Sequence, residues 1–477
     1  MIRLFLSEKI YNRFSDLYRP LAVLTILFLA ALLGQRATLT IVVFLALVFV
    51  GLVALIVLTR RPDWGLLAII PVSFLVRFEL GTGTNIPFNA TFLLVTGLTG
   101  FWIVRKLIID GAVRLPPSRV NAPALAFLVS VTLSMIAGSV NWIPWITEKA
   151  SLPAQAGAWL IYVLSVTVLF IMADYVRDVH VLRVMVWFFL GIGTIYVISR
   201  ISRAGYQPII RNINYPSTGA MFWTWFAALA FGQGWINRDL RVFWRVFLLT
   251  MVTVALWTCW AYGRNEWVSG WLPPLVAIAV ILWLRSWRLG AACTLLGGLF
   301  YLVYGAVVST QVMTTTQEYS ISSRLATFPI MLELIKANPV LGLGPANYYY
   351  YTSLYPILGW YVQFNSHNNY VDIAAQFGLL GLGLFTWMVI ELARLGWGLR
   401  RYFEDGFRLA YSISALGGMA GMLVSGFLGD WFLPFLYNIG IPGFRASLFA
   451  WIFLGGLLVL EQDMLREKRE ANMAINL

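Results

Sequence analysis

The chain has 477 residues, of which 60% are hydrophobic and only 12% are charged. Ordinary soluble domains carry about 25% charged residues, so a water-soluble protein of this size is excluded. The 34 Lys and Arg residues outnumber the 21 Asp and Glu residues and give a net charge of +13, which in a membrane protein is explained first by basic cytoplasmic loops and not by nucleic acid. We therefore expect an all-α, polytopic membrane protein with no nucleic-acid partner.

Residues 1–19 place apolar side chains at helical spacing between basic ones. This pattern predicts an amphipathic helix on the cytoplasmic membrane surface and not a cleavable signal peptide. About fourteen transmembrane helices of roughly 20 residues are expected to follow. They are predicted at 20–34, 37–59, 63–77, 87–108, 121–139, 153–174, 181–199, 217–236, 245–262, 266–284, 289–309, 368–393, 408–429 and 444–460. The chain is thus divided into helices 1–11 (20–309), a long connection (310–366), helices 12–14 (367–460) and a cytoplasmic tail (461–477).

Most Lys and Arg residues fall at the two termini and in the connections that follow even-numbered spans. Because cytoplasmic loops concentrate basic residues, both termini are expected in the cytoplasm and the long connection on the outer, periplasmic face. Membrane topology does not explain the arginines that remain on the outer face. Four of them lie in or beside outer connections: Arg203, Arg211, Arg264 and Arg324.

The outer connection 310–366 is long enough to have structure of its own. Leu325, Phe328 and Leu332 recur at helical spacing, which predicts a helix lying on the outer surface. We expect Pro329 to kink this helix. Most of the tyrosines and tryptophans further along the connection are interpreted as an aromatic belt at the membrane interface, and none is assigned to a site.

A glycine pair follows this predicted helix in the sequence Asn-Pro-Val-Leu-Gly-Leu-Gly, residues 338–344. Gly342 and Gly344 allow a tight turn and a close approach of backbone N–H groups to a ligand. The alternative is a turn that simply ends the helix after Pro339. The sequence leaves both interpretations open.

The chain contains two histidines, and only one lies in a position that suggests chemistry. His180 is interpreted as a solvated residue of a cytoplasmic connection. His367 lies where an apolar segment enters the membrane from the outer face, and a histidine there is a candidate general base. The alternative is a helix N-cap region in which Ser366 or Asn368 is the cap.

Two further charged residues lie at or inside the membrane. Arg264, at the boundary between two predicted spans, is either an interface anchor or a ligand for a phosphate group. Asp372 lies within a predicted span, where an acid suggests function. It is five residues from His367, about 140° around a helix, so we expect it to pair with an arginine elsewhere.

Three sequence features together resemble the O-antigen ligase and polymerase superfamily, over about residues 200–430. They are Arg264 with Val268 four residues on, Arg324 on a helix that leads to the 338–344 segment, and His367-Asn368 followed after nine residues by Gly378-Leu-Leu-Gly381. The last is the most specific. The family's arginine motif usually has leucine where this chain has Val268.

The resemblance implies a metal-independent membrane glycosyltransferase of the GT-C type that needs no cofactor. It would move a glycan from an undecaprenyl-pyrophosphate donor to an acceptor hydroxyl on the outer face of the bacterial inner membrane. His367 would be the general base, and Arg264, Arg324, Arg211 and Arg203 would bind the pyrophosphate. Asn368, Gly342, Gly344, Gly378 and Gly381 would support the site.

Two acceptors fit this family. A polymerase extends a lipid-linked glycan, whereas a ligase transfers the finished glycan to lipid A-core. The connection 310–366 carries few basic residues for a phosphorylated lipid A-core, which favours a polymerase. The alternative function is a transporter that flips the lipid-linked glycan, but such a protein needs polar groups along the whole membrane path, and few intramembrane charges occur.

Overall fold

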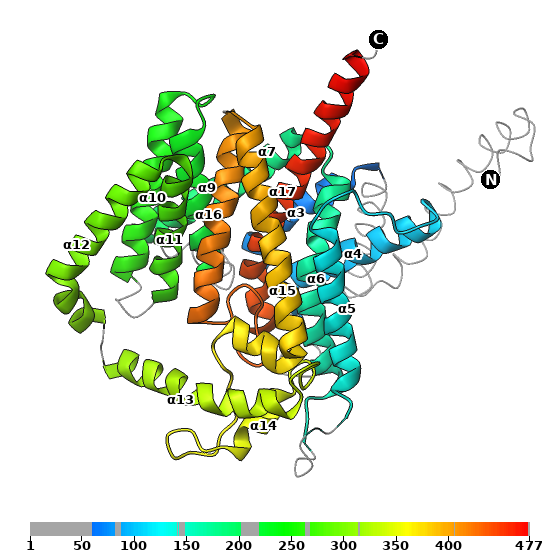
Figure 1. Cartoon of the computed structure of the whole chain (residues 1–477), viewed down its shortest axis with the longest axis vertical. Helices are drawn as coiled ribbons and strands as arrows, with labels where there is room; N and C mark the ends of the chain where they lie inside the picture. The colour runs from blue at the N-terminus through cyan, green and yellow to red at the C-terminus, as the bar shows by residue number, and fades with distance from the viewer. Residues whose placement is uncertain are drawn as a thin grey trace, which may run out of the picture. The chain divides into compact units, whose positions relative to one another are not determined.

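The computed structural model describes residues 60–81, 87–140, 142, 148–201, 219–262, 268–312, 315–404 and 406–475 (Figure 1). The predicted surface helix 1–19 and the predicted spans 20–34 and 37–59 lie outside these residues. The chain divides into two units, Met1–Trp64 and Gly65–Leu477. In the described part of the first unit, Arg61 forms an ion pair with Asp63 at 2.9 Å. The second unit contains the bundle and the candidate site.

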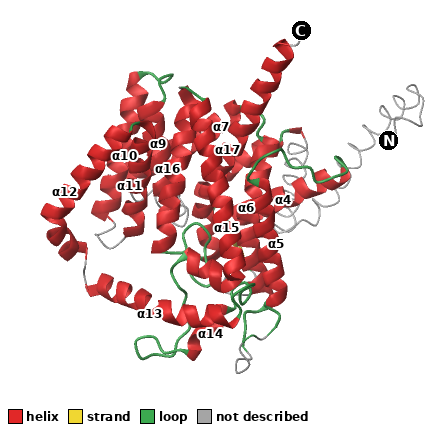
Figure 2. Ribbon diagram, viewed as in Figure 1, coloured by secondary structure: helices red, strands yellow, loops and turns green. Residues whose placement is uncertain are grey.

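The described residues form helices joined by loops (Figure 2). The main helices are α3 (Pro62–Leu75), α4 (Ala90–Ile108), α5 (Asn121–Ala137), α6 (Leu152–Tyr175), α7 (Val179–Ile201), α9 (Ala220–Ile236), α10 (Val242–Tyr262), α11 (Val268–Arg285), α12 (Trp287–Val312), α13 (Thr315–Ala337), α15 (Asn369–Tyr402), α16 (Gly406–Leu428) and α17 (Gly440–Ile475). Two single turns, α14 (Tyr348–Tyr351) and the 3-10 helix η3 (Thr352–Leu354), lie between α13 and α15. The strands β1 (Glu79–Leu80) and β2 (Phe88–Asn89) pair antiparallel. The predicted all-α class is confirmed.

Nine of the described helices are long and apolar enough to cross a membrane. They are α4, α6, α7, α10, α11, α12, α15, α16 and α17. The protein is therefore a multi-pass membrane protein, as expected. Each predicted span that falls on described residues coincides with a helix, whereas the total of about fourteen spans stays a prediction.

Glycines allow the central helices of the bundle to pack closely. A Cβ atom at Gly421 of α16 would lie 2.5 Å from the carbonyl oxygen of Pro273 in α11. One at Gly417, a turn earlier, would lie 2.6 Å from the carbonyl oxygen of Ala277. Membrane helices associate through such small residues, because lipid supplies no hydrophobic force to drive them together.

The helix predicted within the outer connection is α13. It starts before the predicted apolar pattern and continues through Pro329, and the predicted kink at this proline stays a prediction. Figure 1 shows α13 lying across the ends of the bundle helices instead of parallel to them. It packs against α15 and η3, and these contacts fix it beside the beginning of α15.

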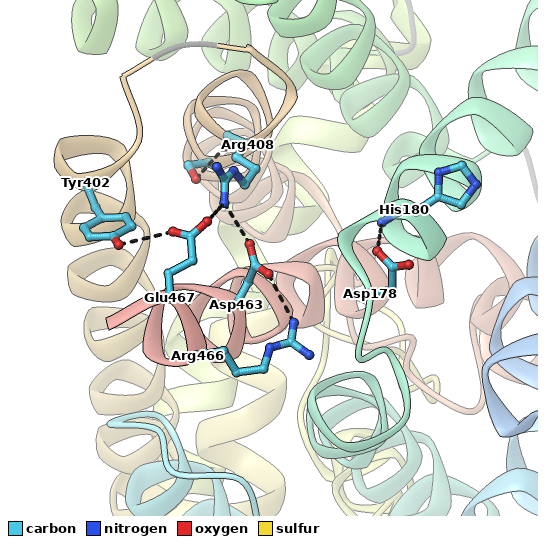
Figure 3. Close-up of polar contacts among 8 residues, drawn as sticks. Asp178, His180, Tyr402, Arg408, Asp463, Arg466 and Glu467 are labelled. Carbon is cyan, nitrogen blue, oxygen red and sulfur yellow. Dashed lines mark hydrogen bonds and ion pairs between the residues drawn. The ribbon is translucent and has the colours of Figure 1, made fainter. Parts of the chain in front are cut away.

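The segment predicted as a separate tail is a continuation of α17, which extends without interruption to Ile475. Arg408 at the start of α16 pairs with Asp463 at 3.0 Å and also with Glu467 (Figure 3). The hydroxyl group of Tyr402 donates to Glu467 at 3.2 Å. These side chains hold the first turns of the extension against α15 and α16.

His180 is exposed in the second position of α7. Its backbone N–H donates to the carboxylate of Asp178 at 2.7 Å (Figure 3). The contact belongs to the start of the helix and leaves the imidazole in solvent. His180 is therefore solvated, as expected, although it is in a helix and not in a loop.

Candidate functional site

His367 lies in the turn that leads into α15, one residue before the helix cap. Its φ of +49° is a left-handed conformation that residues other than glycine seldom adopt and that clusters at functional sites. The side-chain oxygen of Asn368 accepts hydrogen bonds from the backbone N–H groups of Tyr370 at 3.0 Å and Val371 at 3.3 Å. Asn368 is therefore the N-cap of α15, and the imidazole of His367 is not needed for this task.

A chain of polar side chains leads from His367 into the protein. The Nδ2 atom of Asn438 lies 3.4 Å from Nδ1 of His367 and donates to Oδ1 of Asp430 at 2.7 Å. The second oxygen of Asp430 accepts from the backbone N–H of Phe435 at 2.8 Å. Burial raises the pKa of the fully buried Asp430 carboxyl, and the hydrogen bonds from Phe435 and Asn438 oppose this rise. These two donors support the carboxylate form.

This arrangement determines which ring nitrogen of His367 accepts a proton. A carboxylate needs a donor, so Asp430 fixes the orientation of the Asn438 amide. The amide nitrogen has no acceptor capacity, so it can contact Nδ1 of His367 favourably only when that nitrogen carries the lone pair. The proton of the neutral ring is then on Nε2. A separation of 3.4 Å is long for a hydrogen bond, and a better donor can replace the amide.

Arg324 is close enough to this chain for its charge to act on His367 and to be influenced by Asp430. It belongs to α13, and its Nη1 atom donates to the carbonyl oxygen of Leu428, the last residue of α16, at 3.1 Å. This bond uses one of the five N–H donors of the guanidinium. Burial lowers the pKa of Arg324 and the nearby Asp430 raises it. A guanidinium group is not deprotonated in proteins, so Arg324 is charged at neutral pH.

The surroundings of His367 keep its imidazole neutral. Burial is the larger cause, and the positive charge of Arg324 adds to it; together they lower the pKa of His367 to about 4. Both effects disfavour the imidazolium form. At neutral pH the ring therefore has a free lone pair next to a fixed cation.

Asp372 of α15 stabilises the turn that contains His367. One oxygen of this fully buried carboxyl accepts from the hydroxyl groups of Tyr348 at 2.5 Å and Ser366 at 2.7 Å. No described arginine pairs with Asp372, and its second oxygen, Oδ2, has no hydrogen-bond partner among the described residues, so the expected pairing with an arginine stays a prediction. Tyr348 is fully buried and hydrogen-bonded to this turn, so this tyrosine does not belong to the predicted aromatic belt.

The glycine-containing segment 338–344 packs against a break in α15 at Gly378. The backbone N–H groups of Leu343 and Gly344 donate to the carbonyl oxygens of Ala375 at 2.9 Å and Gln376 at 3.0 Å. In return, Leu379 N–H donates to the carbonyl of Pro339 at 2.7 Å. The glycines permit this backbone contact, since the φ values at 342, 344 and 378 are +73°, +89° and +71°.

The amide N–H groups of Gly342 and Gly344 are therefore already used inside the protein. Gly342 N–H donates to the carbonyl of Asn338 at 3.0 Å and thereby closes the turn that follows Pro339. A ligand would have to replace these bonds. Gly381 lies one turn after the break, where a Cβ atom would be 2.5 Å from Cβ of Phe377. These contacts of the glycines lie within the 338–344 segment, within α15 or between the two.

We expect Gly378→Ala to destabilise the protein by more than about 2 kcal/mol. The added Cβ would overlap the carbonyl oxygen of Val340, and the φ of +71° would be strained for alanine. Gly383→Ala is the matched control, because nothing lies within 4 Å of its Cβ position in the same helix. It should be neutral or stabilise by about 0.5–1 kcal/mol. Thermal unfolding in detergent, followed by size-exclusion chromatography, measures both; equal midpoints for the two variants would contradict the prediction.

A buried amide near His367 has no hydrogen-bond partner among the described residues. It is Nδ2 of Asn365, whose side chain is 6% exposed. Such a group is available to a ligand hydroxyl or phosphate oxygen. Within the described part of the chain, no group of three or more His, Cys, Asp or Glu side chains could hold a metal ion.

Of the predicted site residues, the structure brings His367 and Arg324 close enough to interact electrostatically. Arg203, Arg211 and Arg264 lie outside the described residues. Sequence analysis assigned no role to Asp430 or Asn438. The available signal was their position: two polar residues in an apolar connection that the predicted topology places on the same side as His367.

Comparison with known proteins gives one result. None of the curated proteins matches the chain. Residues 249–386 match the family model described as O-antigen ligase. The matched segment includes Arg264, Arg324 and His367 and ends beyond the break at Gly378, and so contains every feature on which the sequence resemblance rests. This match supports membership of the chain in the O-antigen ligase and polymerase superfamily.

Proposed function

We propose that the protein transfers a glycan from an undecaprenyl-pyrophosphate carrier to a sugar hydroxyl on the outer face of the bacterial cytoplasmic membrane. The observation that carries this proposal is the neutral imidazole of His367, held by Asn438 beside the charged Arg324. A glycan transfer needs both groups: a base for the acceptor hydroxyl and a cation for the pyrophosphate that leaves. The family match supports the same reaction class.

The acceptor hydroxyl displaces the Asn438 amide and gives its proton to Nδ1 of His367 as its oxygen attacks the anomeric carbon of the donor. The bond from that carbon to the pyrophosphate oxygen breaks, and the pyrophosphate keeps the bonding electrons. Arg324 stabilises this charge, together with Arg264 and Arg211, and Arg203 contributes less. These cations take the place of a metal ion. Asn365 binds a hydroxyl or phosphate oxygen of the substrates.

Transfer by the purified protein in detergent, with lipid-linked donor and acceptor, tests this proposal directly. A transporter only moves the lipid-linked glycan across a membrane, so it would form no glycosidic bond and give no product in this assay. The acceptor is identified by deleting the gene and separating the lipopolysaccharide on a gel. If the deletion strain keeps lipopolysaccharide with one repeat unit but loses the ladder, the protein is the polymerase that we favour. If the lipopolysaccharide loses the glycan completely, the protein is a ligase.

The activity should decline in acid as His367 is protonated. The base works only when deprotonated, so kcat/KM should be constant above about pH 5 and fall as the pH drops through about 4. An unperturbed histidine would instead lose activity around pH 6.5. A kcat/KM profile between pH 3.5 and 8 distinguishes the two. A midpoint near 6.5 would show that burial and Arg324 do not lower the pKa of the catalytic group.

The proposed orientation places the loop before His367 outside and the connection between α15 and α16 in the cytoplasm. Gln363→Cys should react with a membrane-impermeant thiol reagent in spheroplasts, and Glu404→Cys should react only after lysis. Both positions are exposed. The background needs Cys293→Ser, since Cys293 is exposed while Cys259 is buried. The reverse labelling pattern would invert the topology.

A further inference from the structure

Three arginines surround a pocket at the end of the bundle far from His367. The pocket measures about 440 Å³, and its charged lining consists of Arg238, Arg245 and Arg285. Arg400, near the end of α15 opposite to His367, donates to the carbonyl oxygen of Leu284 in the last turn of α11 at 2.5 Å. Leu284 precedes the pocket residues Arg285 and Ser286, so the pocket lies at that end of α15. The pocket is therefore separate from the candidate transfer site.

The charges of this pocket have no acidic partner among the described residues. No acidic side chain lines it, and none of its three arginines forms an ion pair with another described residue. Arg245 is held in place by donating to the backbone carbonyls of Gly234 at 3.1 Å and Trp235 at 3.3 Å. Like charges that share a concave site repel one another, and a bound anion relieves that repulsion.

The position of the pocket along the helices matches the headgroup layer of a bilayer. Trp235 lines the pocket. Trp244 and Trp287, which adjoin the pocket residues Arg245 and Ser286 in the sequence, are exposed as well. Exposed tryptophans gather at the boundary between membrane and water. The guanidinium of Arg288 lies 5.8 Å from the ring of Trp287, which places basic and aromatic groups side by side.

An apolar surface leads from the pocket along α12. Leu289 closes one side of the pocket, and further along the helix Leu296, Leu299 and Phe300 are exposed. A free anion would make no use of this surface. The acyl chains of a lipid would cover it while the headgroup occupied the pocket.

We propose that this pocket binds the phosphate headgroup of an anionic membrane phospholipid, with the acyl chains along α12. Guanidinium groups bind phosphate oxygens in pairs, and basic pockets between membrane helices are suited to such headgroups. Cardiolipin, with two phosphates and four chains, fits three arginines and a long apolar face best. The site is independent of the transfer reaction.

Native mass spectrometry of the full chain in detergent tests the proposal with cardiolipin and phosphatidylethanolamine as probes. Wild-type protein should retain cardiolipin in preference to phosphatidylethanolamine. Arg238→Gln combined with Arg285→Gln should weaken cardiolipin binding about tenfold or more. The matched control combines Arg241→Gln with Arg288→Gln, two exposed arginines of the same connections that do not line the pocket. It removes the same charge and should bind like the wild type.

Two outcomes would overturn the proposal. Equal loss in both double variants would mean that general surface charge, not the pocket, attracts the lipid. Displacement of cardiolipin by millimolar inorganic phosphate would assign the pocket to a free anion. Thermal midpoints without added lipid identify a variant that is misfolded, and in that case Arg285→Gln and Arg288→Gln are compared as single changes.

Discussion

His367→Ala should abolish glycan transfer while the protein stays folded and still binds the lipid-linked donor. A sugar hydroxyl is a poor nucleophile until its proton is removed, and a well-placed base contributes about 10²–10⁴-fold. The imidazole of His367 makes one hydrogen-bond contact with the described side chains, at 3.4 Å to Asn438, and Asn368 caps α15, so removal of the ring breaks no strong polar contact. Transfer is measured with purified protein, and donor binding is measured separately.

His367→Asn separates the base from a structural role at the start of α15. Asparagine tolerates left-handed φ values and is a good N-cap, so it suits the backbone at +49°. Asn368 already provides the cap through its bonds to the Tyr370 and Val371 N–H groups. The variant should therefore be as stable as the wild type and as inactive as His367→Ala. Wild-type activity in His367→Asn would falsify the general-base hypothesis.

Asn438→Ala examines the tautomer argument without removing the base. The ring would lose the donor that keeps the proton on Nε2, while the bond from Phe435 N–H to Asp430 would remain. Asn438 does not take part in the proposed bond changes, so it is a positioning residue, and we expect a smaller loss of kcat than in His367→Ala.

The helices of this protein could be predicted because each depends on a local pattern. Apolar runs of about 20 residues identify membrane helices with little reference to the rest of the chain, and the predicted segments agree with α4, α6 and α16 within a few residues. The end of α17 was missed because its extension is polar. It is held by Arg408 and Tyr402, whose contacts with the extension cannot be read from the sequence of α17.

The break in α15 could not be predicted for a related reason. Residues 369–402 have the composition of one continuous helix, and Gly378 alone does not interrupt a helix. The break forms because the 338–344 segment supplies partners for the freed backbone groups, among them the Pro339 carbonyl for Leu379 N–H. Such partners are a condition for irregular backbone among membrane helices.

The site could be predicted in part. The residue types of His367 and Arg324 indicated a base and a cation, and their sequence neighbours indicated the family. The partners could not be predicted, because hydrogen bonds across the fold depend on geometry that spacing does not reveal. Asp372 shows this limit: its spacing from His367 did not reveal that one oxygen of the carboxyl accepts from Tyr348 and Ser366.

Arg324→Ala should lower kcat by about 10²–10³-fold, the usual cost of removing one group that stabilises charge in the transition state. Arg324→Lys should recover little, because an ammonium group lacks the planar pair of donors that fits phosphate oxygens. Lys336→Gln, three turns along α13, is the control. Lys336 is exposed and paired with Glu333, and its replacement should leave kcat unchanged.

Arg324 also joins α13 to α16 through the Leu428 carbonyl, so a loss of activity in Arg324→Ala alone could reflect a displaced helix. Arg324→Gln separates the two roles, since the glutamine amide is a neutral donor that can still reach toward the carbonyl. We expect this variant to be stable but as slow as alanine. The acid limb of its kcat/KM profile, where activity falls as His367 is protonated, should also move to higher pH, because the charge of Arg324 lowers the pKa of His367. Burial remains the larger cause, so the limb should stay below pH 6.5. A slow, stable variant with an unchanged limb would mean that Arg324 does not act beside His367, and near-wild-type turnover would reduce Arg324 to a structural tie between α13 and α16.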